Sequence, residues 1–99
     1  MPALKVHETD NVATVFEDET SQGTVVDIYD PQGVIESLPA KSDIPFGHKI
    51  AIRDINAGEA IVKYGEIIGA ATKSIATGEH VHVHNLDSQR GRGDLSNEI

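Results

Sequence analysis

The chain has 99 residues, a formal net charge of −8 and no cysteine. The length suits one domain, and the apolar share of 38% lies below the usual range of about 45–50%, so the core must rest on aliphatic side chains and a partner subunit could support it. The acidic balance argues against binding to nucleic acid or to an anionic membrane. The absence of cysteine excludes disulfides and thiolate metal sites and fits a cytoplasmic protein.

Short apolar runs separated by turn residues dominate the chain and predict an all-β fold. The expected strands cover residues 4–7, 12–16, 24–29, 34–38, 48–54, 60–64 and 66–68, followed by a strand through the histidines after residue 79. Strands of this length at a spacing of about 8–12 residues are typical of a β-sandwich, a barrel or a similar compact sheet. Over residues 69–74 a short helix stays open as an alternative.

Turn residues organise two parts of this pattern. Residues 30–33, Asp-Pro-Gln-Gly, have the composition of a turn and predict a hairpin between the strands on either side. The sequence Ile-x-x-Gly-Glu occurs twice, at residues 55–59 and 75–79, each time before an expected strand. We interpret this echo as one kind of turn used twice and not as a repeat architecture.

Three of the five histidines, His80, His82 and His84, stand at alternate positions. On an extended strand such side chains share one face at intervals of roughly 6.6–6.8 Å. Imidazole is a common ligand of zinc, iron, nickel and copper and titrates near neutral pH. Three rings in such a row span about 13 Å, so we expect at most two neighbours to share one metal ion. The alternative is that the rings face solvent or pack singly against the sheet.

His48 and Lys49 form a second candidate group at the start of an expected strand. Gly47 precedes them and allows a close approach of the backbone. Alternation along the strand places His48 on the same face as Ile50 and Ile52 and directs Lys49 to the opposite face. The alternative is that His48 is only a polar residue at the beginning of a strand.

The chain changes character after residue 86. We expect a domain over residues 1–86 and a polar tail over residues 87–99 that is flexible or binds a partner. The tail carries Arg90 and Arg92, whose guanidinium groups can hold a carboxylate in bidentate fashion. They could equally bind an acidic patch on another subunit or remain in solvent.

Three stretches together resemble a known family. They are Ile-Pro-Phe-Gly-His-Lys-Ile-Ala-Ile at residues 44–52, Gly-Glu-Ala-Ile-Val-Lys-Tyr-Gly-Glu-Ile-Ile-Gly at residues 58–69, and Gly-Glu-His-Val-His-Val-His-Asn-Leu at residues 78–86. They are similar to the N-terminal SAF-type domain, or small subunit, of the altronate/galactarate dehydratase family. The resemblance covers nearly the whole chain and implies a β-clip fold, a compact domain of short, bent strands.

The resemblance also implies a reaction and a set of site residues. Members of this family eliminate water from sugar acids and depend on a divalent metal, iron or manganese. It implies that His48 and His82 lie at the active site as metal ligands or acid–base groups, and that Lys49 neutralises the substrate carboxylate. His84 is the next expected metal ligand, whereas His80 ranks lower. For substrate binding we expect Arg90 and Arg92.

The resemblance further implies that this chain is a small subunit without activity of its own, completed by a large catalytic subunit. The similar small subunit of sulfolactate sulfo-lyase, which eliminates sulfite, is one alternative. A non-catalytic module that binds a metal or a sugar acid is another, and a domain used only as an interface is a third. A homo-oligomer is also compatible with the modest core.

Overall fold

The computed structural model describes residues 2–16 and 20–88, which form strands and turns and contain no helix. The strands are β1 (Pro2–Leu4), β2 (Val12–Val15), β3 (Val25–Asp30), β4 (Gly33–Pro39), β5 (Lys49–Ala51), β6 (Ala60–Lys63), β7 (Glu66–Ala71), β8 (His80–Val81) and β9 (Leu86–Ser88). The predicted all-β fold is therefore confirmed over these residues. The same part of the chain holds no helix that could serve as a membrane span.

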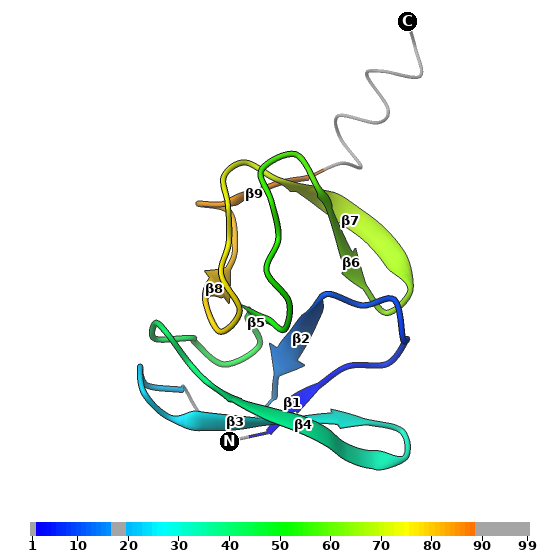
Figure 1. Ribbon diagram of the computed structural model, residues 1–99, viewed down its shortest axis with the longest axis vertical. Coiled ribbons are helices and arrows are strands. Elements are labelled where there is room, and N and C mark those ends of the chain that lie inside the picture. Colours follow the sequence, from blue (N-terminus) through cyan, green and yellow to red (C-terminus); the bar gives the residue numbers. More distant parts are fainter. Residues whose placement is uncertain (1, 17–19, 89–99) are drawn as a thin grey trace, which may run out of the picture.

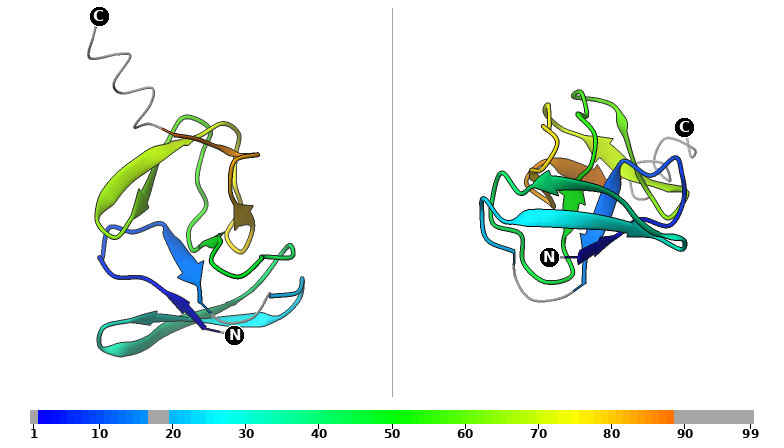
Figure 2. Two further views of the ribbon diagram at one scale, coloured as in Figure 1. Left: turned by 180° about the vertical axis from the view of Figure 1, so that it is seen from behind. Right: turned by 60° about the horizontal axis from the view of Figure 1, so that its bottom comes forward.

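The strands form two sheets that meet around β2, β5 and β8. One sheet has six strands in the order β4-β3-β1-β2-β5-β8, and the other has three in the order β6-β7-β9. Neighbouring strands are antiparallel except for β1 and β3, which are parallel. Figure 1 shows the β3–β4 hairpin at one end of the molecule and the three-stranded sheet at the other, with β5 and β8 between them; Figure 2 shows the same arrangement from behind.

Strand β5 contributes to both parts of the hydrophobic core. Ile50 and Ile52 belong to the cluster that packs under the six-stranded sheet, and Ala51 belongs to the cluster beside the three-stranded sheet. The alternation predicted for this strand is therefore confirmed. The first cluster comprises Ala3, Ala13, Val15, Val26, Ile28, Leu38, Ala40, Ile44, Ile50 and Ile52. The second comprises Val12, Ala51, Ile55, Ile61, Ala71, Ile75 and Val81.

Hydrogen bonds from Asn11 join the two sheets. Its side-chain Nδ2 donates to the carbonyl oxygen of Ala60 at 2.9 Å, and its Oδ1 accepts from the backbone N–H of Val62 at 2.8 Å. The Asn11 carbonyl also accepts a hydrogen bond from the backbone N–H of Ile52. Because Asn11 directly precedes β2, these bonds fix the six-stranded sheet against β6.

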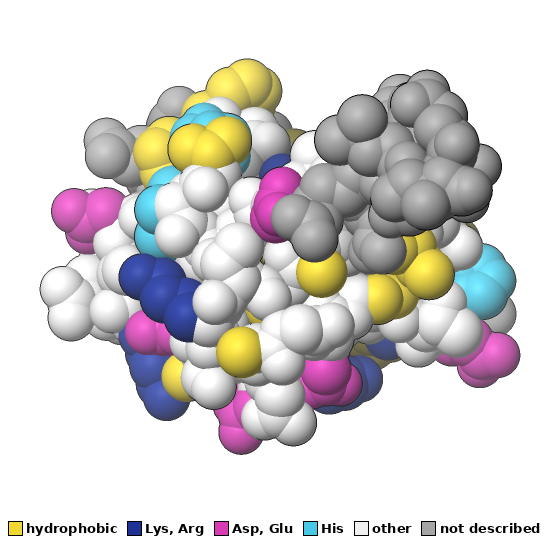
Figure 3. Space-filling model, turned by 90° about the horizontal axis from the view of Figure 1, so that it is seen from above, with side chains coloured by type: hydrophobic (Ala, Val, Ile, Leu, Met, Phe, Trp, Pro, Cys, Tyr) yellow, Lys and Arg dark blue, Asp and Glu magenta, His cyan; other side chains and the backbone are white. Residues whose placement is uncertain are grey.

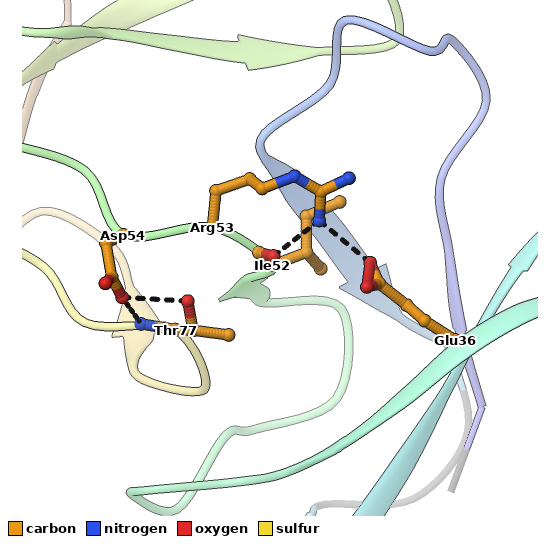
Figure 4. Close-up of polar contacts among 5 residues, drawn as sticks. All are labelled: Glu36, Ile52, Arg53, Asp54 and Thr77. Atoms are coloured by element: carbon orange, nitrogen blue, oxygen red, sulfur yellow. Dashed lines mark hydrogen bonds and ion pairs between the residues drawn. The ribbon is translucent and has the colours of Figure 1, made fainter.

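Side chains that follow β5 make further links across the molecule (Figure 4). Arg53 Nη1 lies 2.9 Å from Glu36 Oε1 on β4 and donates to the Ile52 carbonyl at 2.7 Å. The next residue, Asp54, accepts hydrogen bonds at Oδ1 from the backbone N–H and the hydroxyl of Thr77, both at 2.8 Å. The chain after β5 is thus held to the β3–β4 hairpin on one side and to the turn before β8 on the other.

The predicted hairpin at residues 30–33 is present, and a second hairpin joins β6 and β7. The β3–β4 hairpin turns at residues 30–33, where Asp30 Oδ1 accepts a hydrogen bond from the backbone N–H of Gln32. The β6–β7 hairpin turns at Tyr64 and Gly65. Strand β7 continues to Ala71 because β9 pairs with its second half, so the alternative of a helix over residues 69–74 is wrong.

Two expected strands are shorter or displaced. The strand predicted over residues 4–7 is β1 at Pro2–Leu4, because Asp10 Oδ2 accepts hydrogen bonds from the backbone N–H groups of Val6 and His7 and turns the chain there. The strand predicted over residues 48–54 is limited to β5, since the chain bends at Ile52. At the other end, β9 extends to Ser88, and residues 89–99 lie outside the described residues.

Three turns share one backbone plan, at residues 44–48, 55–59 and 75–79. In each, the last residue donates its backbone N–H to the carbonyl of the residue three positions earlier. These bonds are His48 to Pro45 (3.0 Å), Glu59 to Asn56 (2.9 Å) and Glu79 to Ala76 (3.0 Å). The interpretation of residues 55–59 and 75–79 as one kind of turn is confirmed, and the first turn is a third copy that we did not predict. The second and third copies also pair with each other through Ile55 and Ile75.

Glycine at the fourth position of this turn has a positive φ, and Gly78 has an additional steric role. A Cβ atom at Gly78 (φ +96°) would lie 2.5 Å from the Pro39 carbonyl oxygen, whereas at Gly58 (φ +89°) it would meet open space. We therefore expect Gly58→Ala to lower the free energy of unfolding by about 1–2 kcal/mol, from backbone strain alone. Gly78→Ala should cost about 1–3 kcal/mol more because of the clash. Urea unfolding of both variants measures the difference, and equal losses would contradict the packing described for Gly78.

Candidate metal centre

The turn at residues 44–48 differs from its two copies in the use of its last side chain. In the copies, Glu59 Oε1 accepts a hydrogen bond from the backbone N–H of Asn56 at 2.6 Å, and Glu79 Oε1 accepts one from Ala76 at 2.7 Å. His48 stands at the same position of the first turn, and its ring contacts histidines of another segment. The side chain at this last position closes the turn in the two copies, whereas in the first turn it contacts other histidines.

Strand pairing brings the other histidines to His48. Strands β5 and β8 are antiparallel, with Lys49 opposite Val81 and Ile50 opposite His80. One step beyond the pair of Lys49 and Val81, His48 lies opposite His82. Because alternate residues of a strand share a face, His80 and His82 both lie on the side of His48.

The three rings form a compact group. The ring centroids of His48 and His82 are 4.0 Å apart with an interplanar angle of 20°, and those of His48 and His80 are 5.0 Å apart at 25°. His80 and His82 are 5.6 Å apart at 10°. One ring nitrogen from each histidine can be chosen so that all three lie within 4.8 Å of one another. We call His48, His80 and His82 the histidine trio.

The donor set of the trio fits a divalent metal ion. His48 Nδ1 and His80 Nε2 are 2.8 Å apart, so a proton must lie between them in the metal-free protein to keep two lone pairs from facing each other. A cation bound by both nitrogens would take the place of that proton. Three protein ligands with coordination positions left for water or substrate are typical of catalytic sites, whereas structural sites are closed.

Electrostatics keep the trio in the form that binds metal. Burial, and after it the charge of His48 and of the other neighbours, lowers the pKa of His80 from 6.5 to about 4. Burial and the same kind of charge repulsion also lower the pKa of His82. Two rings of the trio are therefore neutral at neutral pH, which is the state in which imidazole offers a lone pair to a metal.

Asn85 fixes the loop that carries His82. This buried side chain accepts a hydrogen bond at Oδ1 from the backbone N–H of His82 at 3.0 Å and donates through Nδ2 to the His80 carbonyl at 2.9 Å. The backbone N–H groups of Asn85 and Leu86 both donate to the His82 carbonyl. Sequence reasoning missed Asn85, although an asparagine directly after the histidine row is a signal for a turn at that point.

The histidine row is therefore not a continuous strand. Strand β8 ends at Val81 and the chain turns over residues 82–85, so the predicted straight row with a span of about 13 Å is wrong. His80 and His82 both join His48, whereas the ring of His84 lies against His80 at 5.1 Å and is tilted by 39°. His84, the third expected ligand, thus lies beside the trio, and His80, which ranked lower, is part of it.

Lys49 lies close enough to the trio to affect it. Its positive charge contributes to the lowered pKa of both His80 and His82, and burial together with the charge of Lys63 lowers the pKa of Lys49 itself. The charge of Lys49 thus acts on these rings, although strand alternation directs its side chain to the face of β5 opposite His48. The expected substrate-binding residues Arg90 and Arg92 lie outside the described residues.

A depression of 390 Å³ opens beside His80. Its lining includes Ser42, Lys73, Ser74, Glu79, His80 and His84. Figure 3 shows histidine side chains at the surface of the molecule with a lysine or arginine close by and exposed hydrophobic side chains next to them. The trio is thus open to molecules from outside on the side of His80.

Comparison with known proteins identifies the family to which this chain is similar. A family model described as altronate/galactarate dehydratase SAF domain matches residues 1–89. The chain is 44% identical to the altronate dehydratase of Bacillus subtilis over 82 residues, which cover 83% of this chain and 15% of that protein. It is 40% identical to the galactarate dehydratase (L-threo-forming) of Escherichia coli over 78 residues, 79% of this chain and 14% of that protein. The (2R)-sulfolactate sulfo-lyase subunit alpha of Chromohalobacter salexigens is 52% identical over 50 residues, 50% of this chain and 53% of that subunit.

The lowered pKa of His80 predicts how stability depends on pH. Between pH 6.5 and about 4 His80 is protonated in the unfolded chain but not in the folded protein. The free energy of unfolding therefore decreases as the pH falls through this range. In the variant His80→Gln this contribution is absent, and we expect a smaller loss of unfolding free energy than in the wild type. Urea unfolding at several pH values, in the presence of a chelator, measures both. The same loss in the two proteins would contradict the assignment.

Proposed function

Because this chain belongs to the family of altronate/galactarate dehydratase SAF domains, we propose that it is the SAF component of a metal-dependent lyase that removes water from a sugar acid. The relatives named altronate dehydratase and galactarate dehydratase support this class of reaction. The chain spans about a sixth of the length of these dehydratases. The activity, the substrate and the partner of the complete enzyme are therefore part of the proposal.

The observation that carries the proposal is the convergence of His48, His80 and His82 on one face of the β5–β8 pair. We propose that these three residues hold a divalent ion, iron or manganese. When bound, such an ion supplies Lewis-acid chemistry, which stabilises the negative charge that develops on the oxygens of a 2-hydroxy acid when its α-proton is removed. The lowered pKa values of His80 and His82 support a ligand role for both.

Two further groups have proposed roles in substrate binding. Lys49 is half-buried, and in its protonated form its ammonium group can neutralise a substrate carboxylate. Arg90 and Arg92 remain proposed contacts to the same or a second carboxylate. His84, next to His80, is proposed as a group that exchanges a proton with the substrate and not as a ligand.

A larger catalytic polypeptide is the proposed partner. The proposed site commits three imidazoles to the metal ion and the Lys49 ammonium group to the substrate carboxylate, which leaves His84 as its one proton-exchange group, whereas an elimination needs both a base and an acid. The relatives support a division of labour, since one of them is named a subunit alpha and the dehydratases are several times longer than the matched region. A cytoplasmic location and assembly into a homo-oligomer remain predictions.

The alternative function with a specific observation in its favour is that of a sulfolactate sulfo-lyase small subunit. The identity of 52% to such a subunit alpha exceeds that to the dehydratases, although over a shorter stretch. The metal centre would be the same in both cases, and only the leaving group would differ. A module that binds a metal or a sugar acid without taking part in catalysis is the second alternative.

Metal binding by the purified chain tests the trio. We expect one zinc or manganese ion per chain, and a loss of affinity of at least about tenfold in each of His48→Ala, His80→Ala and His82→Ala, because each removes a direct ligand. The matched control is His7→Ala. His7 is an exposed histidine in the turn after β1, so this variant should bind the metal as the wild type does. Competition with a coloured chelator measures the affinities. If His84→Ala weakens binding as much as His80→Ala does, the ligand set is different from the one proposed.

Reconstitution with the larger polypeptide tests the reaction. We expect no turnover by this chain alone and turnover of altronate or galactarate after mixing, with sulfolactate as the competing substrate. His82→Ala should reduce kcat by at least about 100-fold while the complex still forms, because a centre needed for the chemical step is lost. Unchanged turnover in both His48→Ala and His82→Ala would leave the chain with an interface role only.

A further inference from the structure

We propose that the depression beside His80 is a binding subsite for a carboxylate, with the Lys73 ammonium group as its charge partner. Residues 72 and 73 form the bend that follows β7, and Lys73 is exposed there and lines the depression. The ligand class is a small hydroxy acid or dicarboxylate. This inference rests on the proposed function, since it assigns one end of the same acidic substrate.

The charge of the whole chain makes a local cation necessary. A protein with a net charge of −8 repels an acidic ligand at long range, so such a ligand binds only where a positive side chain lies at the site. Lys73 is the cation in the lining of the depression. The acidic residue in that lining, Glu79, has its Oε1 engaged with the Ala76 backbone N–H and serves the turn.

Neutral hydrogen-bond donors complete the subsite. Ser42 Oγ accepts a hydrogen bond from the His80 backbone N–H at 2.9 Å, which leaves its hydroxyl proton for a ligand. Ser74 and the ring of His84 stand in the same lining. One ammonium group, two hydroxyls and an imidazole suit the oxygens of a carboxylate and of a neighbouring hydroxyl group.

The position of the subsite links it to the metal centre. His80 belongs to the trio and also lines the depression, so a carboxylate held by Lys73 lies on the His80 side of the proposed metal. A sugar acid bound in this way would have its first carbons next to the trio. The subsite would thus orient the substrate, with its carboxylate at Lys73 and its neighbouring carbons toward the trio.

A second depression nearby provides the contrast. It has a volume of 520 Å³, and its lining includes Lys41, Asp54 and Glu79, so it carries one carboxylate more than the first depression, where Glu79 is the acidic residue beside Lys73. The same ligand should avoid it because the net charge of the lining is negative. Lys41 is thus a matched control for Lys73, as both are exposed lysines at a depression.

The test is a titration of the ¹⁵N-labelled chain with galactarate, followed by NMR and repeated with the uncharged galactitol at matched ionic strength. We expect galactarate to shift the backbone amides of Lys73, Ser74 and His84, and galactitol to leave them unchanged. Lys73→Gln should raise the dissociation constant at least about fivefold, the effect of one charge-assisted hydrogen bond. Lys41→Gln should leave it within about twofold.

The titration is made both without metal and with zinc, so that the subsite and the metal centre are judged separately. Shifts at these amides that Lys73→Gln weakens support the subsite even if zinc does not bind, in which case only the proposed metal function fails. Shifts elsewhere, no shifts at all, or an equal effect of Lys41→Gln overturn the subsite. In that event tight binding of zinc would still support the proposed metal centre at the trio.

Discussion

The site depends on a short antiparallel pairing between β5 and β8. Only two residue pairs are in register, Lys49 with Val81 and Ile50 with His80, yet they decide that His48 and His82 face each other one step further along. This pairing is held from both sides, because Ile50 and Val81 are fully buried in the two core clusters. A register change of one residue would move the histidines to opposite faces and dissolve the trio.

The repeated turn explains how a domain with a modest core acquires a site at this place. Two of the three copies end in a glutamate whose carboxylate closes the turn, and the first copy ends in His48. In the turn at residues 44–48, Pro45 has no backbone N–H at the position where Asn56 and Ala76 donate, so the turn needs no carboxylate there and the ring of His48 packs against His80 and His82. A residue that departs from the pattern of its structural copies is expected at a functional site, and the other two turns keep the glutamate that closes them.

The sequence predicted what depends on local order. The β3–β4 hairpin follows from Asp-Pro-Gln-Gly, and the alternation of Ile50, Ala51 and Ile52 was assigned to the correct faces. Both kinds of signal come from neighbours in the chain, which turn chemistry and strand periodicity describe well. The family resemblance also predicted that His48 and His82 belong to one site, and the structure brings their rings together.

What the sequence did not predict depends on long-range or tertiary contacts. The histidine row looks like a straight strand by periodicity, but hydrogen bonds of Asn85 to residues 80 and 82 turn it after two residues. His80 could be placed beside His48 only through the register between segments about 30 positions apart. The role proposed for Lys73 depends on the fold in the same way, because Ser42, about 30 positions earlier in the chain, lines the same depression.

The central claim is that the imidazoles of His48, just before β5, and of His80 and His82, in β8 and directly after it, offer ring nitrogens to a single cation. Long-range ¹H–¹⁵N spectra of the histidine rings, recorded while zinc is added to the purified chain, observe this directly. The account predicts that one ring nitrogen each of His48, His80 and His82 moves to the position of a metal-bound nitrogen at one equivalent of zinc, whereas the ring of His7 keeps its spectrum. Metal-bound signals from fewer than two of these rings, or from His84 in place of His80, would contradict it.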